Sequence, residues 1–519
     1  MEIRMLKDEY WWGGSVVNAH QMPYSEKSVC KVNLTEEWHT QSAPLYLSSK
    51  GRYIWCEDPF VIEFNNGKIT ITTESEVKLY EAGNTLRDAY LTAMKRHFPF
   101  AENIHTPREF YKYPQFNTWM ELIKNQNQED IIKYAEEVVE NGYKPGILII
   151  DGGWQICQGN WEPRRDMMPD PKAMTDKLHQ LGFIVMIWVS PFMCSEGQMF
   201  LDLYTDYAVE GKQNELRYNH LVRYKDGTAA IHQWWSGYSA LYNFNLPDDC
   251  AHMANQLRHL MDDYGFDGFK FDGGTYKPHS FKGGIDFYGD YTPADLNNAW
   301  MEFASSYKFH EVKDSWKQGG KQMVQRLWDK HHSWTEQGIN CLIPHGCFEG
   351  LVGSPFICPD MVGGGEWTAF IKGECEEELF VRMAECSALF PMMQFSALPW
   401  RRLSEKGQKI CKDMADLHEK MFPEIEKILS DSENTGEPMV RSMEYMYPGH
   451  GYEEINDQFM LGENILVAPV VVKGQTEKEV NLPEGKWTEQ NTTETYVGPC
   501  KIKVDAPLET LPWFIKNNG

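Results

Sequence analysis

A unit of helix, glycine, apolar strand and terminal polar or aromatic residue recurs in the middle of the chain and limits the folds open to it. In the first copy, apolar residues at helical spacing stop at Gly142, and the strand ILII runs into Asp151. In the second copy, a helix pattern between Pro171 and Gly182 precedes the strand FIVMIWVSPF, which contains Trp188. Such repeats are typical of an α/β barrel, whose chemistry lies at the carboxyl ends of its strands.

The third copy contains the stretch GFDGFKFDGG at residues 265–274. A helix pattern leads into it, and Gly265 stands where a helix C-terminal glycine belongs. The short strand that follows puts Lys270 and Asp272 on one face, because side chains two apart in a strand point the same way. The two glycines after Asp272 let the backbone turn sharply. An acid at a strand end often only caps a turn, but the lysine beside Asp272 favours a functional role.

Two further strand patterns end in acids: MVQRLW runs into Asp329, and GSPFICP precedes Asp360. Several acids and aromatic side chains at a barrel mouth, without a phosphate loop, suit glycoside hydrolysis. In that reaction one carboxylate attacks the sugar and a second, protonated carboxyl gives a proton to the leaving oxygen. Lys270 is expected to keep Asp272 ionised, as a nucleophile requires.

Two other classes of protein stay open at this point. Clustered acids in a barrel also bind Mg²⁺ or Mn²⁺, so a metal-dependent barrel enzyme is one alternative, although the glycine pairs and the tryptophans give it no support. A non-catalytic sugar-binding protein is the other. Trp234, Trp235 and Trp400 are candidate platforms for sugar rings, and buried packing explains any one of them equally well.

Composition narrows the partners. The net charge of −25 over 519 residues argues against nucleic acid, whose phosphates would be repelled. No apolar run approaches the roughly 18 residues of a membrane span. The first residues have no apolar signal core, which predicts a cytoplasmic location, with secretion after removal of a leader left open. The 12 cysteines show no metal spacing, so we expect neither a metal nor an organic cofactor, and a homo-oligomer stays open.

The chain is too long for one compact core. We expect an N-terminal β-sandwich at residues 1–105, a catalytic (β/α)₈ barrel at 106–420 and a C-terminal β-sandwich at 421–519. Asn65-Asn66-Gly67 predicts a hairpin turn, and Tyr10 to Gly14 is expected to be an aromatic, turn-rich loop. Residues 273–320 are expected to hold inserted helices and loops. In the C-terminal part, LPEGKW is expected to be a turn and LPWFIKNNG a final strand.

At these residues the chain resembles glycoside hydrolase family 31. GFDGFKFDGG is similar to the family's nucleophile strand, which implies that Asp272 forms a covalent glycosyl-enzyme. The segment RLWDKHHSW is similar to the one that carries the acid/base, which implies that Asp329 is the proton donor. CPDMVGG resembles the family's Asp-Ile-Gly-Gly segment, so Asp360 would bind the sugar in the −1 subsite, where Asp151 and Trp188 would also lie. The resemblance spans nearly the whole chain.

The departures from the family pattern bear on the sugar. Typical α-glucosidases of the family carry Trp-Gly-Asp-Asn and Arg-x-His segments, where this chain reads LWDK and, ending at Ser396, MQFS. KFDGG and CPDMVGGG look closer to the branch that includes α-galactosidases. That branch has a sugar-contacting arginine before the acid/base, and its nearest equivalent here is Lys313, a point charge and not a planar fork.

These observations predict a retaining, exo-acting α-glycosidase that hydrolyses a terminal α-linked hexose by double displacement. The substrate would be a small oligosaccharide or glycoside, with α-galactosidase as the first interpretation. An α-glucosidase, an α-N-acetylgalactosaminidase or a sulfoquinovosidase of the same family is the alternative. The expected catalytic residues are Asp272 and Asp329. The expected substrate-binding residues are Asp151, Trp188, Lys270, Lys313, Arg326, Asp360 and Trp400.

Overall fold

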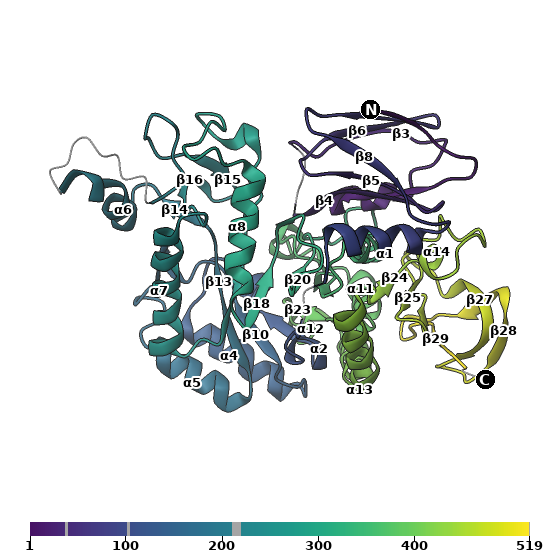
Figure 1. Cartoon of the computed structure of the whole chain (residues 1–519). Helices are drawn as coiled ribbons and strands as arrows, with labels where there is room; N and C mark the ends of the chain where they lie inside the picture. Colours follow the sequence, from purple (N-terminus) through teal and green to yellow (C-terminus); the bar gives the residue numbers. More distant parts are fainter. Residues whose placement is uncertain (37–39, 101–103, 210–219, 518–519) are drawn as a thin grey trace. The chain divides into compact units, whose positions relative to one another are not determined.

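The computed structural model describes residues 1–36, 40–100, 104–209 and 220–517. They form two compact units (Figure 1). Unit 1 comprises Met1–Leu34, Gln41–Phe116 and Lys317–Gly519, and unit 2 comprises Thr35–Thr40 and Asn117–Trp316. Within the described ranges, no helix combines the length and the apolar character that crossing a bilayer requires.

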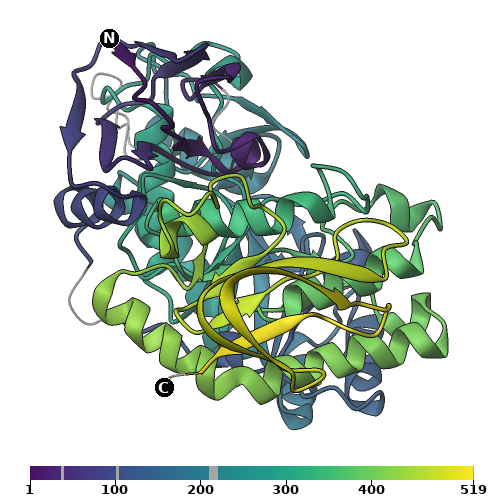
Figure 2. The ribbon, with the colours of Figure 1, turned by 90° about the vertical axis from the view of Figure 1, so that its right-hand side faces the viewer.

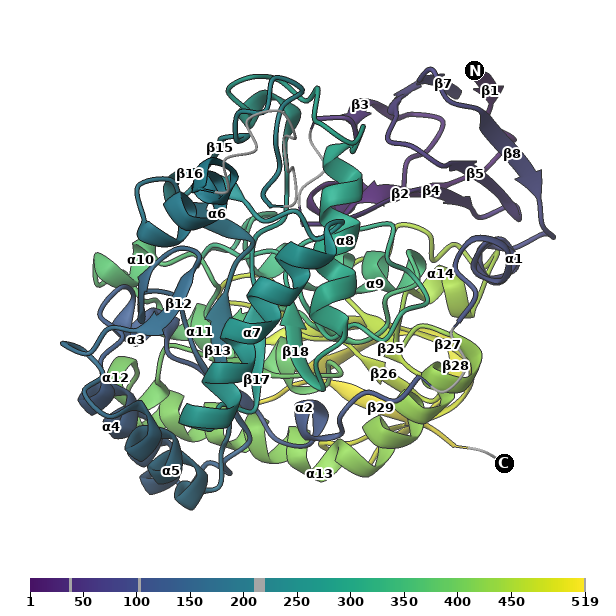
Figure 3. The ribbon, with the colours of Figure 1, turned by 60° about the vertical axis from the view of Figure 1, so that its left-hand side comes forward.

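Unit 2 contains a parallel sheet in which strands alternate with helices along the chain. The strands pair in the order β10-β13-β17-β18, and α7 and α8 cover the outside of this sheet (Figure 3). The strands are β10 (Ile147–Ile150), β13 (Ile184–Val189), β17 (Gly268–Phe271) and β18 (Phe309–Val312). The helices are α4 (Gln128–Glu140), α5 (Pro171–Leu181), α7 (Pro247–Tyr264) and α8 (Pro293–Ser305). The repeat read from the sequence is thus a βα repeat.

Local sequence sets where these helices begin and end. Pro171 is the first residue of α5 and the Asp170 carboxylate accepts from the backbone N–H of Ala173, while Gly182 closes the helix in the left-handed conformation. Gly265 ends α7 in the same way, as predicted. The expected insertion at residues 273–320 needs correction, because it contains the helix α8 and the strand β18 of the regular repeat.

Loops between these elements carry small additions. One antiparallel sheet has the strand order β14-β16-β15 and its own aromatic core around Phe192, Tyr276 and Phe281. The added elements of unit 2 are α3 (Trp119–Leu122), β11 (Gln155–Cys157), β12 (Asn160–Pro163), β14 (Phe192–Cys194), α6 (Gln198–Val209), β15 (His232–Trp234), β16 (Gly237–Leu241), η2 (Pro278–Ser280) and β19 (Ser315–Trp316).

The N-terminal part of unit 1 consists of two antiparallel sheets. One has the order β1-β7-β6-β3, and the other contains β4, β5 and β8 with β2 on β4. Asn66 and Gly67 both have positive φ and join β6 to β7, which confirms the predicted hairpin. The expected aromatic loop at Tyr10 to Gly14 is instead mostly strand, because Trp11 and Trp12 are buried in β2. The elements are β1 (Glu2–Arg4), β2 (Trp11–Ser15), η1 (Val16–Gln21), β3 (Val29–Asn33), β4 (Gln41–Ser48), β5 (Arg52–Cys56), β6 (Val61–Asn65), β7 (Lys68–Thr72), β8 (Val77–Glu81) and α1 (Leu86–His97).

Unit 1 also contains short parallel strand pairs and long helices. β20 pairs with β21, and β22 pairs with β23, which pairs with Gln115 and Phe116 of β9. The helix α13 spans 31 residues from a Ser404 cap to the left-handed Gly436. These elements are α2 (Glu109–Lys112), β9 (Gln115–Asn117), β20 (Gln325–Arg326), η3 (Ile339–Cys341), α9 (Leu342–Leu351), β21 (Ile357–Cys358), β22 (Met361–Val362), α10 (Thr368–Ile371), α11 (Glu377–Ala388), β23 (Gln394–Phe395), α12 (Pro399–Arg402) and α13 (Glu405–Thr435).

The C-terminal β domain is an antiparallel sheet with the order β24-β25-β26-β29-β27-β28, and its long hairpin is strongly curled (Figure 2). The LPEGKW segment, expected as a turn, lies inside β27, where a register shift between Leu482 and Gly485 bends the strand. The predicted last strand is β29, and residues 518–519 of that segment lie outside the described residues. The elements are β24 (Val440–Arg441), α14 (Met443–Met446), β25 (Phe459–Leu461), β26 (Ile465–Val467), β27 (Glu477–Glu489), β28 (Thr495–Asp505) and β29 (Trp513–Lys516).

Candidate active site

Asp272 lies one residue beyond β17, and two N–H groups hold its carboxylate. The indole Nε1–H of Trp188 donates to Oδ2 at 2.8 Å, and the backbone N–H of Gly273 donates to Oδ1 at 2.9 Å. Trp188 is itself fixed, because the ring of Trp161 meets it edge-on and the indole of Trp154 donates to its carbonyl oxygen at 2.8 Å. The orientation of the Asp272 carboxylate is therefore set by a packed aromatic cluster.

The two glycines after Asp272 are required by the local backbone. Gly273 has φ of +74° and Gly274 has φ of +110°, a region that side-chain-bearing residues rarely adopt. A Cβ at Gly273 would overlap the ring of Phe192, and one at Gly274 would overlap Trp300. The chain thus turns away immediately after the acid and leaves the carboxylate at the strand end.

Lys270 pairs with Asp151. Its Nζ lies 2.6 Å from Oδ2 of Asp151, which also accepts from the Asn117 amide at 3.0 Å, while the backbone N–H of Gly152 donates to Oδ1 at 2.8 Å. Burial raises the pKa of Asp151, but the Lys270 ammonium and these hydrogen bonds outweigh it, so the pKa lies below its ordinary value. The expectation that Lys270 serves Asp272 is corrected: the lysine reaches past β13 to the end of β10, because β13 lies between their strands.

Asp314 is a buried acid that the sequence reasoning missed. β17 and β18 pair with Phe271 opposite Val312, so Asp272 and Asp314 follow neighbouring strands at the same end. Burial, and after it the negative charge of Asp272, raise the pKa of Asp314 to about 6, against an opposing hydrogen bond from Thr275.

Lys313 precedes this acid and was predicted to contact sugar. It is buried, and its positive charge acts to lower the pKa of Asp314. Its backbone N–H donates to the carbonyl of Phe271 at 3.3 Å, which ties it to the strand that carries Asp272. The structure therefore places the charge of Lys313 next to Asp314.

In unit 1, one guanidinium nitrogen joins the other two predicted acids. Nη1 of Arg326 donates to Oδ1 of Asp329 at 2.7 Å and to Oδ1 of Asp360 at 2.6 Å. Oδ2 of Asp360 accepts from the backbone N–H of Lys330 at 2.6 Å and of Gly365 at 2.8 Å. The Asp360 side chain is fully buried, whereas that of Asp329 is 43% exposed. Arg326, predicted to bind substrate, is thus buried between two acids.

The backbone explains why these two acids differ. The strand β20 ends at Arg326, so Asp329 lies in the following loop and not at a strand end as predicted. That loop is held at its base, because the backbone N–H of His331 donates to the carbonyl of Gln337 at 2.8 Å. Trp400, the last predicted substrate contact, is half-buried in α12.

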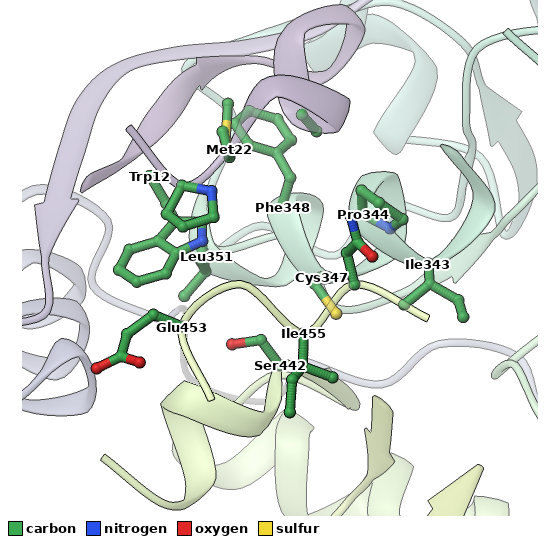
Figure 4. Close-up of a pocket in the computed structure, with 13 residues that line it drawn as sticks. Trp12, Met22, Ile343, Pro344, Cys347, Phe348, Leu351, Ser442, Glu453 and Ile455 are labelled. Atoms are coloured by element: carbon green, nitrogen blue, oxygen red, sulfur yellow. The ribbon is translucent and has the colours of Figure 1, made fainter. Parts of the chain in front are cut away.

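Two other features were searched for a ligand site. Within the described part of the chain, no group of three or more histidine, cysteine, aspartate or glutamate side chains is placed to hold a metal ion. An apolar crevice of about 430 Å³ lies in unit 1 (Figure 4), lined by side chains that include Trp12, Met22, Phe348 and Ile455. Its lining, drawn from the described residues, contains none of the predicted site residues.

Known proteins resemble this chain over much of its length. It is 29% identical over 394 residues to the mouse (Mus musculus) myogenesis-regulating glycosidase, covering 73% of this chain and 52% of that protein. It is 27% identical over 385 residues to the isomaltosyltransferase of Sporosarcina globispora, covering 68% of this chain and 34% of that protein. The chain therefore spans about half the length of the first relative and a third of the second. Neither name supports the expected α-galactosidase-like branch.

The solved structure of a Flavobacterium johnsoniae GH31 dextranase complexed with isomaltotriose has a TM-score of 0.82 to this chain at 20% identity, covering 99% of this chain and 66% of that one. This likeness confirms the predicted α/β barrel with flanking β domains. The model of the glycosyl hydrolases family 31 TIM-barrel domain matches residues 109–426, and that of the glycosyl hydrolase family 31 C-terminal domain matches residues 436–519. With a barrel match over more than half of its length, the chain belongs to glycosyl hydrolase family 31.

Proposed function

We propose that this protein is a retaining, exo-acting α-glycosidase that hydrolyses a terminal α-linked hexose. Family membership supports the reaction class. The observation that carries the proposal is the contrast between Asp272, fixed at a strand end by two N–H donors, and Asp329, half-exposed beside a second acid. A double displacement needs two carboxyl groups with different roles, about 5–5.5 Å apart.

Asp272 is the proposed nucleophile. Its two hydrogen-bond donors both require an acceptor, which a carboxylate supplies, and they hold the attacking oxygen in one direction. In the first step an Asp272 oxygen bonds to the anomeric carbon while the bond from that carbon to the leaving oxygen breaks. The Asp151–Lys270 pair, on the same sheet, is proposed to bind hydroxyl groups of the same sugar.

Asp329 is the proposed proton donor. Asp360 takes three hydrogen bonds and is the better stabilised of the two acids that share Arg326, so it suits the charged role. A second negative charge beside it is disfavoured, which suits a proton on Asp329. Asp329 gives this proton to the leaving oxygen. It then takes a proton from water, whose oxygen attacks the anomeric carbon and releases Asp272 with retained configuration.

An α-linked glucose unit is the first candidate substrate. The names of the relatives support it, since isomaltosyl groups and isomaltotriose consist of α-linked glucose. One observation favours an α-galactoside as the second candidate. Where family α-glucosidases carry Arg-x-His, this chain has a buried Gln394, whose amide donates to Gln115 at 2.9 Å, followed by Phe395 and Ser396.

Rates on a panel of 4-nitrophenyl α-glycosides test the proposal. The α-glucoside, α-galactoside, α-N-acetylgalactosaminide and α-sulfoquinovoside should be compared with one enzyme preparation, with the Asp272→Asn variant as the blank. Preference for the glucoside or the galactoside decides between the two candidates. Preference for either of the other two sugars would keep the mechanism and change the sugar, and silence on all four would contradict the proposed activity.

A further inference from the structure

Exposed tryptophans are rare in this protein. Of the tryptophans in the described residues, only Trp235, at 64% exposure, and Trp367, at 41%, are exposed. An indole presents a large flat apolar face that stabilises a protein when it is buried, and single exposed apolar residues are common enough to need no explanation by themselves. Whether Trp367 has a ligand therefore depends on where its loop lies.

The loop that carries Trp367 is packed against the proposed proton donor. The backbone N–H of Gly365 donates to Asp360 at 2.8 Å, and the N–H of Glu366 donates to the carbonyl of Lys330 at 3.0 Å. A Cβ at Gly365 would overlap a carboxylate oxygen of Asp329. The backbone two residues before the indole is therefore in direct contact with the acid, with no room for a side chain between them.

The surface beside this acid is open and apolar. In the part of the chain that the structure describes, the Trp367 indole has neither a hydrogen bond nor a ring contact. Ile371, one helical turn further along α10, is 58% exposed, and its backbone N–H donates to the carbonyl of Trp367 at 3.1 Å. The Asp329 side chain is exposed to a similar extent, at 43%. The acid and the indole are thus both available to a ligand from solvent.

The position of the proton donor fixes what lies next to it. A general acid must hydrogen-bond to the oxygen that links the cleaved sugar to the leaving group. The leaving group therefore extends from that oxygen past the residues around Asp329. A flat apolar ring suits the C–H face of a pyranose, as aromatic platforms do for other flat ligands. We propose that Trp367 is the platform on which the sugar ring of the leaving group rests; the proposal depends on the glycosidase function proposed above.

The experiment separates leaving groups with and without a ring. Wild type, Trp367→Ala, Trp367→Phe and Trp235→Ala should be compared on α-glucosyl and α-galactosyl fluoride and on disaccharides of the same sugars, such as isomaltose and melibiose. Fluoride leaves without a second sugar, so rates on the fluorides report the folding and chemistry of each variant. Trp235→Ala is the matched control, because it removes a more exposed indole from unit 2.

The proposal predicts that Trp367→Ala lowers kcat/KM on the disaccharide about tenfold, through KM, while the rate on the fluoride changes less than about twofold. Trp367→Phe should recover most of the loss. Equal losses on both substrates, or a disaccharide loss no larger than that of Trp235→Ala, would overturn the platform and leave the glycosidase function standing. A wild-type protein without activity on either kind of substrate would overturn the proposed function and this inference with it.

Discussion

In unit 2 the carboxylates of Asp272 and Asp151 each have their own partners, whereas in unit 1 Asp329 and Asp360 share one nitrogen of Arg326. The first arrangement fixes two charges separately, deep in a packed sheet. The second joins a fully buried acid to a half-exposed one. The comparison suggests that the unit 2 cluster is built to hold charge in place, and the unit 1 cluster to let one acid exchange a proton with its surroundings.

The comparison is broken most directly by removing the attacking acid. Asp272→Ala should lower kcat by about 10⁴-fold or more on every substrate, because a nucleophile has no substitute in the first step. Added azide should restore part of the rate and give a product of inverted configuration, which NMR of the anomeric proton detects. Asp263→Ala, on the exposed end of α7, is the control and should keep wild-type rates. Azide rescue with retention would contradict the assignment.

Removing the proton donor should give a loss that depends on the leaving group. Asp329→Ala should lower kcat/KM on a disaccharide by about 10²–10⁴-fold. Glycosyl fluoride needs no proton on its leaving group, so its rate should fall by less than about tenfold. The ratio of the two losses, measured with the same preparation, is the readout, and equal losses would move the proton donor to another residue.

The unit 2 cluster should depend on its ion pair for stability. Lys270→Met leaves the buried Asp151 carboxylate without its cation and should lower the free energy of unfolding by about 3–5 kcal/mol. Lys177→Met breaks a surface ion pair with Glu136 and should cost about 0–1 kcal/mol. Urea unfolding followed by tryptophan fluorescence measures both, and similar losses for the two variants would argue against a tightly buried pair.

Asp314 predicts a smaller, pH-dependent effect within the unit 2 cluster. Its pKa is raised from an ordinary value of 3.8 to about 6, so its contribution to stability is fully present below about pH 4 and is lost as the pH rises through about 6. Asp314→Asn should therefore gain about 2–3 kcal/mol relative to wild type between pH 4 and pH 7. Unfolding free energies at both pH values test this, and a constant difference between the two proteins would show that Asp314 does not titrate in this range.

Sequence reasoning predicted the regular parts of unit 2 well, because the local signals agree with the fold. Pro171, Gly182 and Gly265 mark helix ends through backbone conformation, and this information is carried by single residues. The strand β18 was missed because its sequence FHEV buries His310 and Glu311, so no apolar run marks it. Asp314 was missed with it.

Side-chain partners were harder to predict than strands. Lys270 and Asp272 are two residues apart in sequence, but the lysine pairs with Asp151, 119 residues away, across the intervening strand β13. The shared role of Arg326 has the same cause, since Asp360 reaches it from a loop 34 residues further along the chain. Such pairings depend on strand order, and periodicity within one segment does not contain that order.

Trapping of the covalent intermediate tests the central claim most directly. The enzyme should be incubated with a 5-fluoro-α-glycosyl fluoride of the preferred sugar, and its intact mass and peptide map should be measured. The account predicts one added glycosyl group per chain, on the peptide that contains Asp272. Labelling of Asp329 or another carboxylate in place of Asp272, or continued turnover of the natural substrate without any label, would contradict it.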